Sequence, residues 1–135
     1  MKIAIRYYSK TGHTKKMAEV VEKVTGAQAL DTTHPVDEEV DVLFLGSAVY
    51  AAGIDDRIKK FIATLSKEKV KNVICFSSAA VLASSYSQVK SLLEKQGLSV
   101  DAREFHCKGQ FSFIQRGHPN DEDLKNLEDF VRGVI

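Results

Sequence analysis

Five short apolar runs alternate with amphipathic helical patterns along this chain, and this alternation restricts the possible fold more than any other feature of the sequence. The runs cover residues 3–8, 28–30, 40–45, 73–76 and 98–105. Alternating strands and helices indicate βαβ units, in which right-handed crossovers join parallel strands. The sequence therefore predicts an α/β fold: a doubly wound five-stranded parallel sheet of order 2-1-3-4-5, in a single domain over residues 1–135.

The residue pattern within each run predicts where the strand lies in the sheet. Runs 3–8, 40–45 and 73–76 are almost continuously apolar, which is typical of central strands covered on both faces. Run 28–30 is short and run 98–105 begins by alternating apolar and polar residues, so we expect both at the edges. Four apolar stripes at helical spacing should face the sheet: Met17, Val21 and Val24; Ile58, Phe61, Ile62 and Leu65; Val89, Leu92 and Leu93; and Leu124, Leu127 and Val131.

The turn between the first strand and the first helix carries three hydroxyls and a glycine within six residues. Side-chain and backbone donors at the positive end of a helix bind anions. The alternative interpretation is a turn with an ordinary helix N-cap, which accounts for one hydroxyl rather than three. We therefore expect a phosphate cradle, made by Ser9, Lys10, Thr11, Gly12, His13 and Thr14.

Residues 46–53 follow the third run and place an aromatic side chain among small ones. In the predicted winding this segment opens onto the same crevice as the cradle. Tyr50 is suited to stacking on a flat ring, although a tyrosine packed in an ordinary loop is an equally good interpretation of this residue alone. Gly53 permits a positive φ and hence a reorienting peptide. The segment contributes five candidate site residues, Ser47, Ala48, Tyr50, Ala51 and Gly53.

Residues 77–80 follow the fourth run and form the third predicted loop of the crevice. Ser78 and Ala79 are expected to contact the edge of a ring through backbone donors, although loops of this composition are common.

Cysteine and histidine positions do not predict a metal or disulfide site. Cys75 lies inside an apolar run and is expected in the core, whereas Cys107 ends another region of strand-like sequence. The four histidines have no spacing typical of metal ligands.

Charge and hydropathy exclude several classes of partner. With 19 basic and 18 acidic residues the net charge is +1, so no basic surface for nucleic acid is expected. No apolar run approaches the ~18 residues of a membrane span, and a strand pattern begins too early to leave room for a signal peptide. We therefore expect a cytoplasmic location.

The order strand, Ser-Lys-Thr-Gly-His-Thr, helix, followed by Gly-Ser-Ala-Val-Tyr before another helix, resembles the flavodoxin family over almost the whole chain. The resemblance implies that flavin mononucleotide (FMN) is the cofactor and that Tyr50 flanks its isoalloxazine ring. It also implies phosphate contacts from the side chains of Ser9, Thr11 and Thr14 and the backbone amides of Lys10, Gly12 and His13.

The expected function is transient electron transfer between redox enzymes, with no catalytic residue of the chain's own. The alternatives are an FMN-dependent NAD(P)H:quinone-type oxidoreductase and a cofactor-free interaction module on the same fold. Familiar flavodoxins are strongly acidic, whereas here Asp55 and Asp56 are closely followed by Lys59 and Lys60. We therefore expect a less extreme low-potential couple. The sequence does not indicate an oligomeric state.

Overall fold

The computed structural model describes residues 1–9, 12–50, 53–79, 86–108 and 121–135, with the backbone alone at 48–50, 53, 79 and 107–108. Within these ranges the strands are β1 (Ile3–Tyr7), β2 (Ala29–Asp31), β3 (Val42–Tyr50), β4 (Gly53–Ile54), β5 (Val73–Ala79) and β6 (Phe105–Lys108). The helices are α1 (His13–Thr25), α2 (Asp56–Ala63), α3 (Tyr86–Lys95) and α4 (Asp121–Val134).

The sheet has the predicted parallel order. Its strands run β2-β1-β3-β5-β6, and every neighbouring pair in this series is parallel. Numbered among themselves, these five strands have the order 2-1-3-4-5. The two-residue strand β4 lies off this series and pairs with β3 in the antiparallel sense, an addition that the apolar pattern did not predict.

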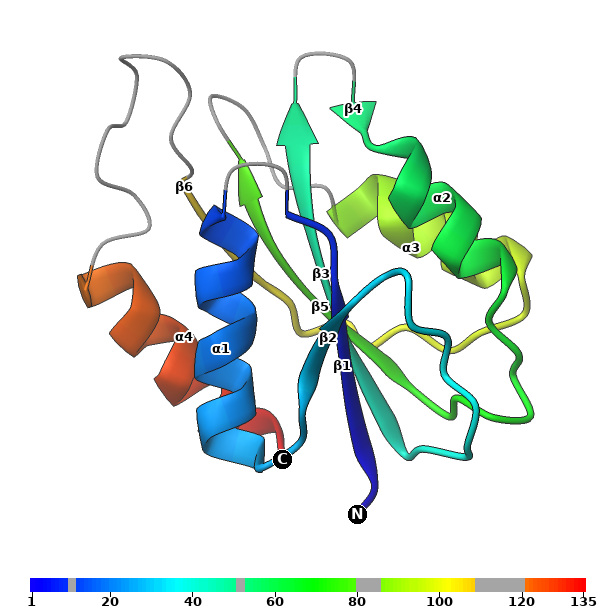
Figure 1. The fold of residues 1–135 in the computed structure, drawn as a ribbon, viewed down its shortest axis with the longest axis horizontal. Coiled ribbons are helices and arrows are strands. Elements are labelled where there is room, and N and C mark those ends of the chain that lie inside the picture. The colour runs from blue at the N-terminus through cyan, green and yellow to red at the C-terminus, as the bar shows by residue number, and fades with distance from the viewer. Residues whose placement is uncertain (10–11, 51–52, 80–85, 109–120) are drawn as a thin grey trace.

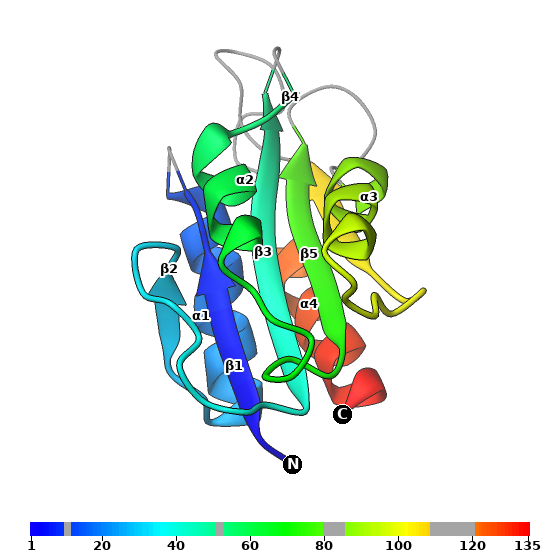
Figure 2. The same cartoon turned by 90° about the vertical axis from the view of Figure 1, so that its right-hand side faces the viewer.

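Helices cover both faces of the sheet, as Figures 1 and 2 show. The apolar residues of α1 and α4 pack on one face with Phe44 and Phe76. Those of α2 and α3 pack on the other face with Leu43 and Leu45. Neighbouring residues of β3 therefore enter opposite cores, which explains why a strand covered on both faces is continuously apolar. The predicted doubly wound α/β fold is confirmed.

The prediction that Cys75 is a core residue is confirmed. It is buried in the core beneath α2 and α3, and burial raises the pKa of its thiol to about 12.

Two strands continue further along the chain than the sequence predicted. Residues 46–53 and 77–80 were interpreted as loops, but β3 continues to Tyr50 and β5 to Ala79. The parallel register between the two strands continues as far as Val49 opposite Ala79. Small and hydroxyl-bearing residues are common in loops, but here the backbone pairing of neighbouring strands determines the conformation.

The predicted strand at 98–105 is wrong over most of its length, because β6 begins at Phe105. Leu98 is buried beneath the end of α3, where its amide donates to the Leu93 carbonyl at 3.1 Å after a left-handed Gly97. This arrangement is a helix C-cap, and its hydrophobic contact produced part of the apolar alternation. Only an isolated bridge between Val73 and Val100 joins this segment to the sheet in the described structure.

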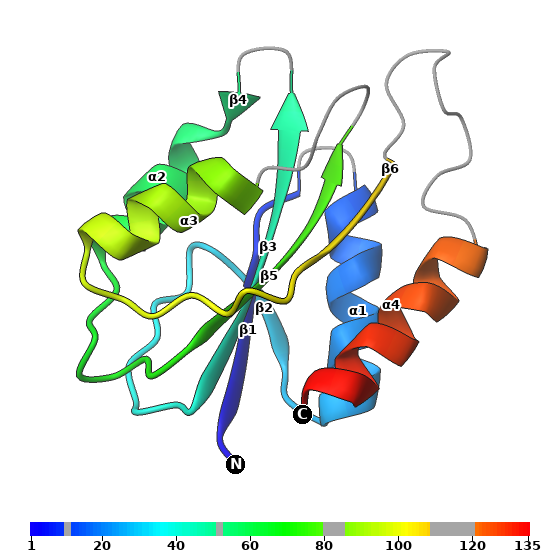
Figure 3. The ribbon, with the colours of Figure 1, turned by 180° about the vertical axis from the view of Figure 1, so that it is seen from behind.

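Both chain ends lie at the same edge of the sheet. In Figures 1 and 3 the N and C marks lie towards the amino ends of the central strands, whereas α1 begins at the opposite, carboxyl edge. In the described part of the chain, no helix has the length and apolar character needed to cross a membrane.

Gly46 allows β3, β5 and α1 to pack closely at the carboxyl edge. A Cβ at this position would lie 2.5 Å from two ring carbons of Phe76 and 3.1 Å from Cγ2 of Thr14. Real carbon contacts are much longer than 2.5 Å, so the glycine leaves the space that the buried Phe76 ring fills. Gly46 therefore sets the position of the first turn of α1 relative to the sheet.

We expect Gly46→Ala to destabilise the fold by about 1–3 kcal/mol, because the added methyl group overpacks this contact. Urea denaturation followed by circular dichroism measures the change. Gly133→Ala is the matched control, since a Cβ there meets no atom within 4 Å and alanine favours the helix. Equal stability of the two variants would contradict the assigned role of Gly46.

Candidate functional site

The carboxyl ends of β1, β3 and β5 converge beside the first turn of α1 (Figure 1). This edge holds the predicted cradle and both of the predicted ring-binding segments. Ligands of open parallel sheets bind at this edge, where the strand order reverses.

Ser9 and Gly12 close the turn that leads into α1. Gly12 has φ +91°, in the left-handed region that favours glycine, and it caps the helix without a side-chain hydrogen bond. Its amide donates to Ser9 Oγ at 2.9 Å, and its carbonyl accepts from the Lys16 amide at 3.1 Å. Ser9 Oγ accepts this bond, so its own hydroxyl hydrogen can donate to a further acceptor.

Thr14 and Ser78 form a buried pair of hydroxyls at the base of the cradle. Thr14 lies in the first turn of α1 and is 1% exposed, while Ser78 lies near the end of β5 and is 4% exposed. The two hydroxyl oxygens are 3.3 Å apart. Only one of the two hydroxyl hydrogens can lie between the two oxygens, so the other can donate to an anion.

The field of α1 also favours an anion at this position. Its first turn contains Lys15 and Lys16 and no acidic residue, so no carboxylate of the helix balances the positive end of its dipole. The amides of a first helical turn have no acceptor within the helix. A bound phosphate would supply an acceptor and a negative charge at this position, so the donor set fits a phosphate group.

Several of the predicted site residues lie in strands or outside the described structure. Ser47 is buried in β3 and lies opposite Ser77 of β5, while Tyr50 lies opposite Gly53 in the β3–β4 hairpin. His13 begins α1. The backbones of Ala48 and Ala79 lie in β3 and β5, and the stacking assigned to Tyr50 and the positive φ assigned to Gly53 stay predictions. The predictions for Lys10, Thr11 and Ala51 lie outside the described residues.

The side chain of Ser78 contacts the cradle, while the ring contact predicted for its backbone stays a prediction. Its loop assignment is wrong because β5 includes it, and its hydroxyl contacts Thr14 of the cradle. The neighbouring Ser77 points its hydroxyl to the other face, where Oγ is buried without a hydrogen-bond partner in the described structure. Side chains alternate between the faces of a strand, so each of the two serines can serve only one face.

Tyr8 and Arg57 form a contact beside the cradle that sequence reasoning missed. The Arg57 guanidinium lies 4.9 Å from the centre of the Tyr8 ring, and its Nη1 donates to the Tyr8 hydroxyl. Asp55 caps α2 by accepting from the Arg57 amide at 2.8 Å, and its Oδ1 lies 3.7 Å from Arg57 Nη1. Tyr8 and Arg57 are 49 residues apart, so no local pattern joins them.

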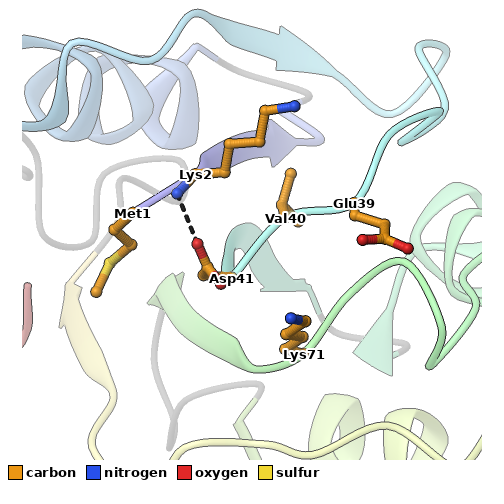
Figure 4. A pocket seen from close by; sticks show the side chains of 6 residues that line it. All are labelled: Met1, Lys2, Glu39, Val40, Asp41 and Lys71. Carbon is orange, nitrogen blue, oxygen red and sulfur yellow. Dashed lines mark hydrogen bonds between the residues drawn. The ribbon is translucent and has the colours of Figure 1, made fainter.

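A hollow of about 460 Å³ lies at the opposite edge of the sheet (Figure 4), lined by Met1, Lys2, Glu39, Val40, Asp41 and Lys71. Its lining has two basic and two acidic side chains, and the Lys2 amide donates to Asp41 Oδ2 at 2.8 Å. Balanced charges give no preference for an anion, so we assign the candidate site to the carboxyl edge.

A family model described as Flavodoxin domain matches residues 4–116. The chain belongs to the flavodoxin family. No curated protein matches it. Because flavodoxins bind flavin, the family assignment agrees with the fit of the cradle to a phosphate group.

Solved structures show the same fold as this flavodoxin-family chain. Oxidised flavodoxin 1 from Bacillus cereus is 18% identical with a TM-score of 0.75, over 98% of this chain and 95% of that one. A flavodoxin from the domain Archaea is 18% identical with a TM-score of 0.78, over 99% and 96%. Rubredoxin oxygen:oxidoreductase from Desulfovibrio gigas is 16% identical with a TM-score of 0.76, over 97% of this chain but 34% of that one.

We expect Thr14→Val to weaken FMN binding by about 1.5–3 kcal/mol, because valine removes a charge-assisted donor and keeps the shape of the side chain. Titration of the apoprotein with FMN, followed by the quenching of FMN fluorescence, measures the dissociation constant. Thr14→Ser is the matched control, since it keeps the hydroxyl and should retain most of the affinity. Unchanged binding by Thr14→Val would remove this residue from the phosphate site.

Proposed function

We propose that this flavodoxin-family chain binds FMN and carries electrons between redox enzymes in the cytoplasm. The observation that carries the proposal is the buried hydroxyl pair of Thr14 and Ser78, next to the turn of Ser9 and Gly12. These donors meet at the positive end of α1, in a helical turn without an acidic residue. Such a donor set is suited to a dianionic phosphate monoester.

The protein would hold the phosphate with these hydroxyls and with the amides of the first helical turn. FMN, when bound, supplies the redox chemistry of its isoalloxazine ring. The β3–β4 hairpin brings the backbones of Tyr50 and Gly53 opposite each other beside the carboxyl end of β5. In the proposed complex this hairpin supplies the aromatic wall and the backbone groups that contact the ring.

Alignment with nearly the whole length of two flavodoxins supports the carrier. The chain covers 95% and 96% of their lengths. A carrier requires only a small contact area around its cofactor, because its complexes with partner enzymes are transient.

We expect the purified chain to retain FMN through gel filtration, with a changed absorption spectrum and quenched fluorescence. In stopped-flow mixing, NADH or NADPH alone should reduce the bound flavin slowly, and an added NADPH-dependent flavodoxin reductase should make reduction rapid. Rapid reduction by the nucleotide alone would instead identify an NAD(P)H:quinone-type reductase. A chain that does not bind FMN would be a cofactor-free interaction module.

The cations beside the hairpin should make the bound flavin less difficult to reduce than in an acidic flavodoxin. Asp55 lies 3.7 Å from Arg57, and Asp56 lies 3.8 Å from Lys59, so a nearby cation offsets each carboxylate. Negative surroundings disfavour an anionic reduced flavin, and positive charges oppose this effect.

We expect Arg57→Gln to lower the midpoint potential of the bound flavin by an amount equivalent to about 0.5–1 kcal/mol, because the variant loses one positive charge near the site. Redox titration at low and high salt measures the change, which should shrink as salt screens the charge. Lys71→Gln, at the opposite edge of the sheet, is the control of equal charge change. An identical shift in both variants would contradict a local effect of Arg57.

A further inference from the structure

A groove runs from the cradle along the first turns of α2. Two adjoining hollows, of about 340 Å³ and 300 Å³, share Thr32, Thr33 and Arg57 in their walls. The first also contacts Ser9 and Gly12 of the cradle. We call this continuous surface the Arg57 groove, lined chiefly by Lys15, Thr32, Thr33, Arg57, Lys60 and Phe61.

The charged side chains of the Arg57 groove are mostly basic. Three basic side chains, Lys15, Arg57 and Lys60, outnumber the Asp31 carboxylate of the lining and the Asp55 carboxylate, which lies 3.7 Å from Arg57. Asp31 Oδ1 already accepts from the Thr33 amide at 2.9 Å and from the Thr33 hydroxyl. These bonds lower the pKa of Asp31, so its carboxylate stays ionised and offsets one of the three cations. The groove therefore presents a positive surface although the chain as a whole carries a net charge of only +1.

Apolar and aromatic surface lies between these charges. Phe61 is buried in the core beneath α2 and contributes to the wall of the second hollow. In the first hollow, the Tyr8 ring lies beneath the Arg57 guanidinium. A ligand that matches this surface combines negative charges with an apolar side chain, and such a combination is typical of an acidic protein segment.

We propose that the Arg57 groove docks an acidic segment of the redox partner protein, with an apolar side chain of that segment placed in the second hollow. The identity of the occupant as a redox partner rests on the proposed function, whereas its chemistry rests on the lining of the groove. Because Ser9 and Gly12 belong to both the groove and the cradle, a partner docked here would lie beside the cofactor phosphate. The positive surface would also steer an acidic partner towards this edge during encounter.

Binding of matched peptides tests the proposal. The probes are the hexapeptide acetyl-EELFEE-amide and its basic counterpart acetyl-KKLFKK-amide, titrated into the ¹⁵N-labelled chain with and without FMN. We expect the acidic peptide, and not the basic one, to shift the amide signals of Thr32, Thr33 and the first turns of α2. No shift, shifts confined to other surfaces, or tighter binding of the basic peptide would overturn the proposal.

A pair of double variants separates the groove from general electrostatics. We expect Arg57→Gln with Lys60→Gln to weaken binding of the acidic peptide about fivefold or more. Lys69→Gln with Lys71→Gln makes the same charge change on exposed residues after α2 and should leave the affinity unchanged. Equal weakening by the two pairs would overturn a specific site, as would tighter binding of a single-stranded DNA 12-mer than of the acidic peptide.

The measurements without FMN distinguish failure of this inference from failure of the proposed function. Peptide binding at the groove by a chain that does not retain FMN would reject the electron carrier and keep the acidic docking surface. Retention of FMN without peptide binding would reject the docking surface and keep the carrier.

Discussion

Close packing at Gly46 is the constraint on which the carboxyl edge of this structure depends. The Phe76 ring occupies the space that any side chain at position 46 would need, and Thr14 lies directly beside it. This packing brings the first turn of α1 against β3 and β5, and the hydroxyls of Thr14 and Ser78 meet as a result. The meeting of these two hydroxyls thus follows from a steric requirement in the core.

The order of the sheet was predictable because burial on both faces leaves a strong signal in the sequence. The continuously apolar runs at 40–45 and 73–76 correspond to the central strands, and right-handed crossovers restrict their arrangement. The strand ends were less predictable. Gly46 and the residues after it have the composition of a loop, and their pairing with β5 and β4 extends the strand. Likewise, Leu98 produced a strand-like pattern although it serves a helix cap.

The candidate site was predictable where its residues are close in the chain. Ser9, Gly12 and Thr14 lie in one turn, so their hydroxyls and glycine could be identified from spacing alone, although the left-handed conformation of Gly12 was not predicted. The contact of Ser78 with Thr14 spans 64 residues and required the fold. The stacking of Arg57 on Tyr8 was missed for the same reason, since an arginine at the start of a helix has many ordinary roles.

The position of both chain ends at the amino edge of the sheet has a practical consequence for attachment of the protein to other components. The first turns of α1 and α2, which border the cradle and the Arg57 groove, lie towards the carboxyl edge, remote from those ends (Figure 1). A linker to an electrode or a fused enzyme, joined at either end, would therefore leave the carboxyl edge uncovered. The length and direction of such a linker would then limit the design of artificial redox assemblies. Obstruction of the carboxyl edge would not.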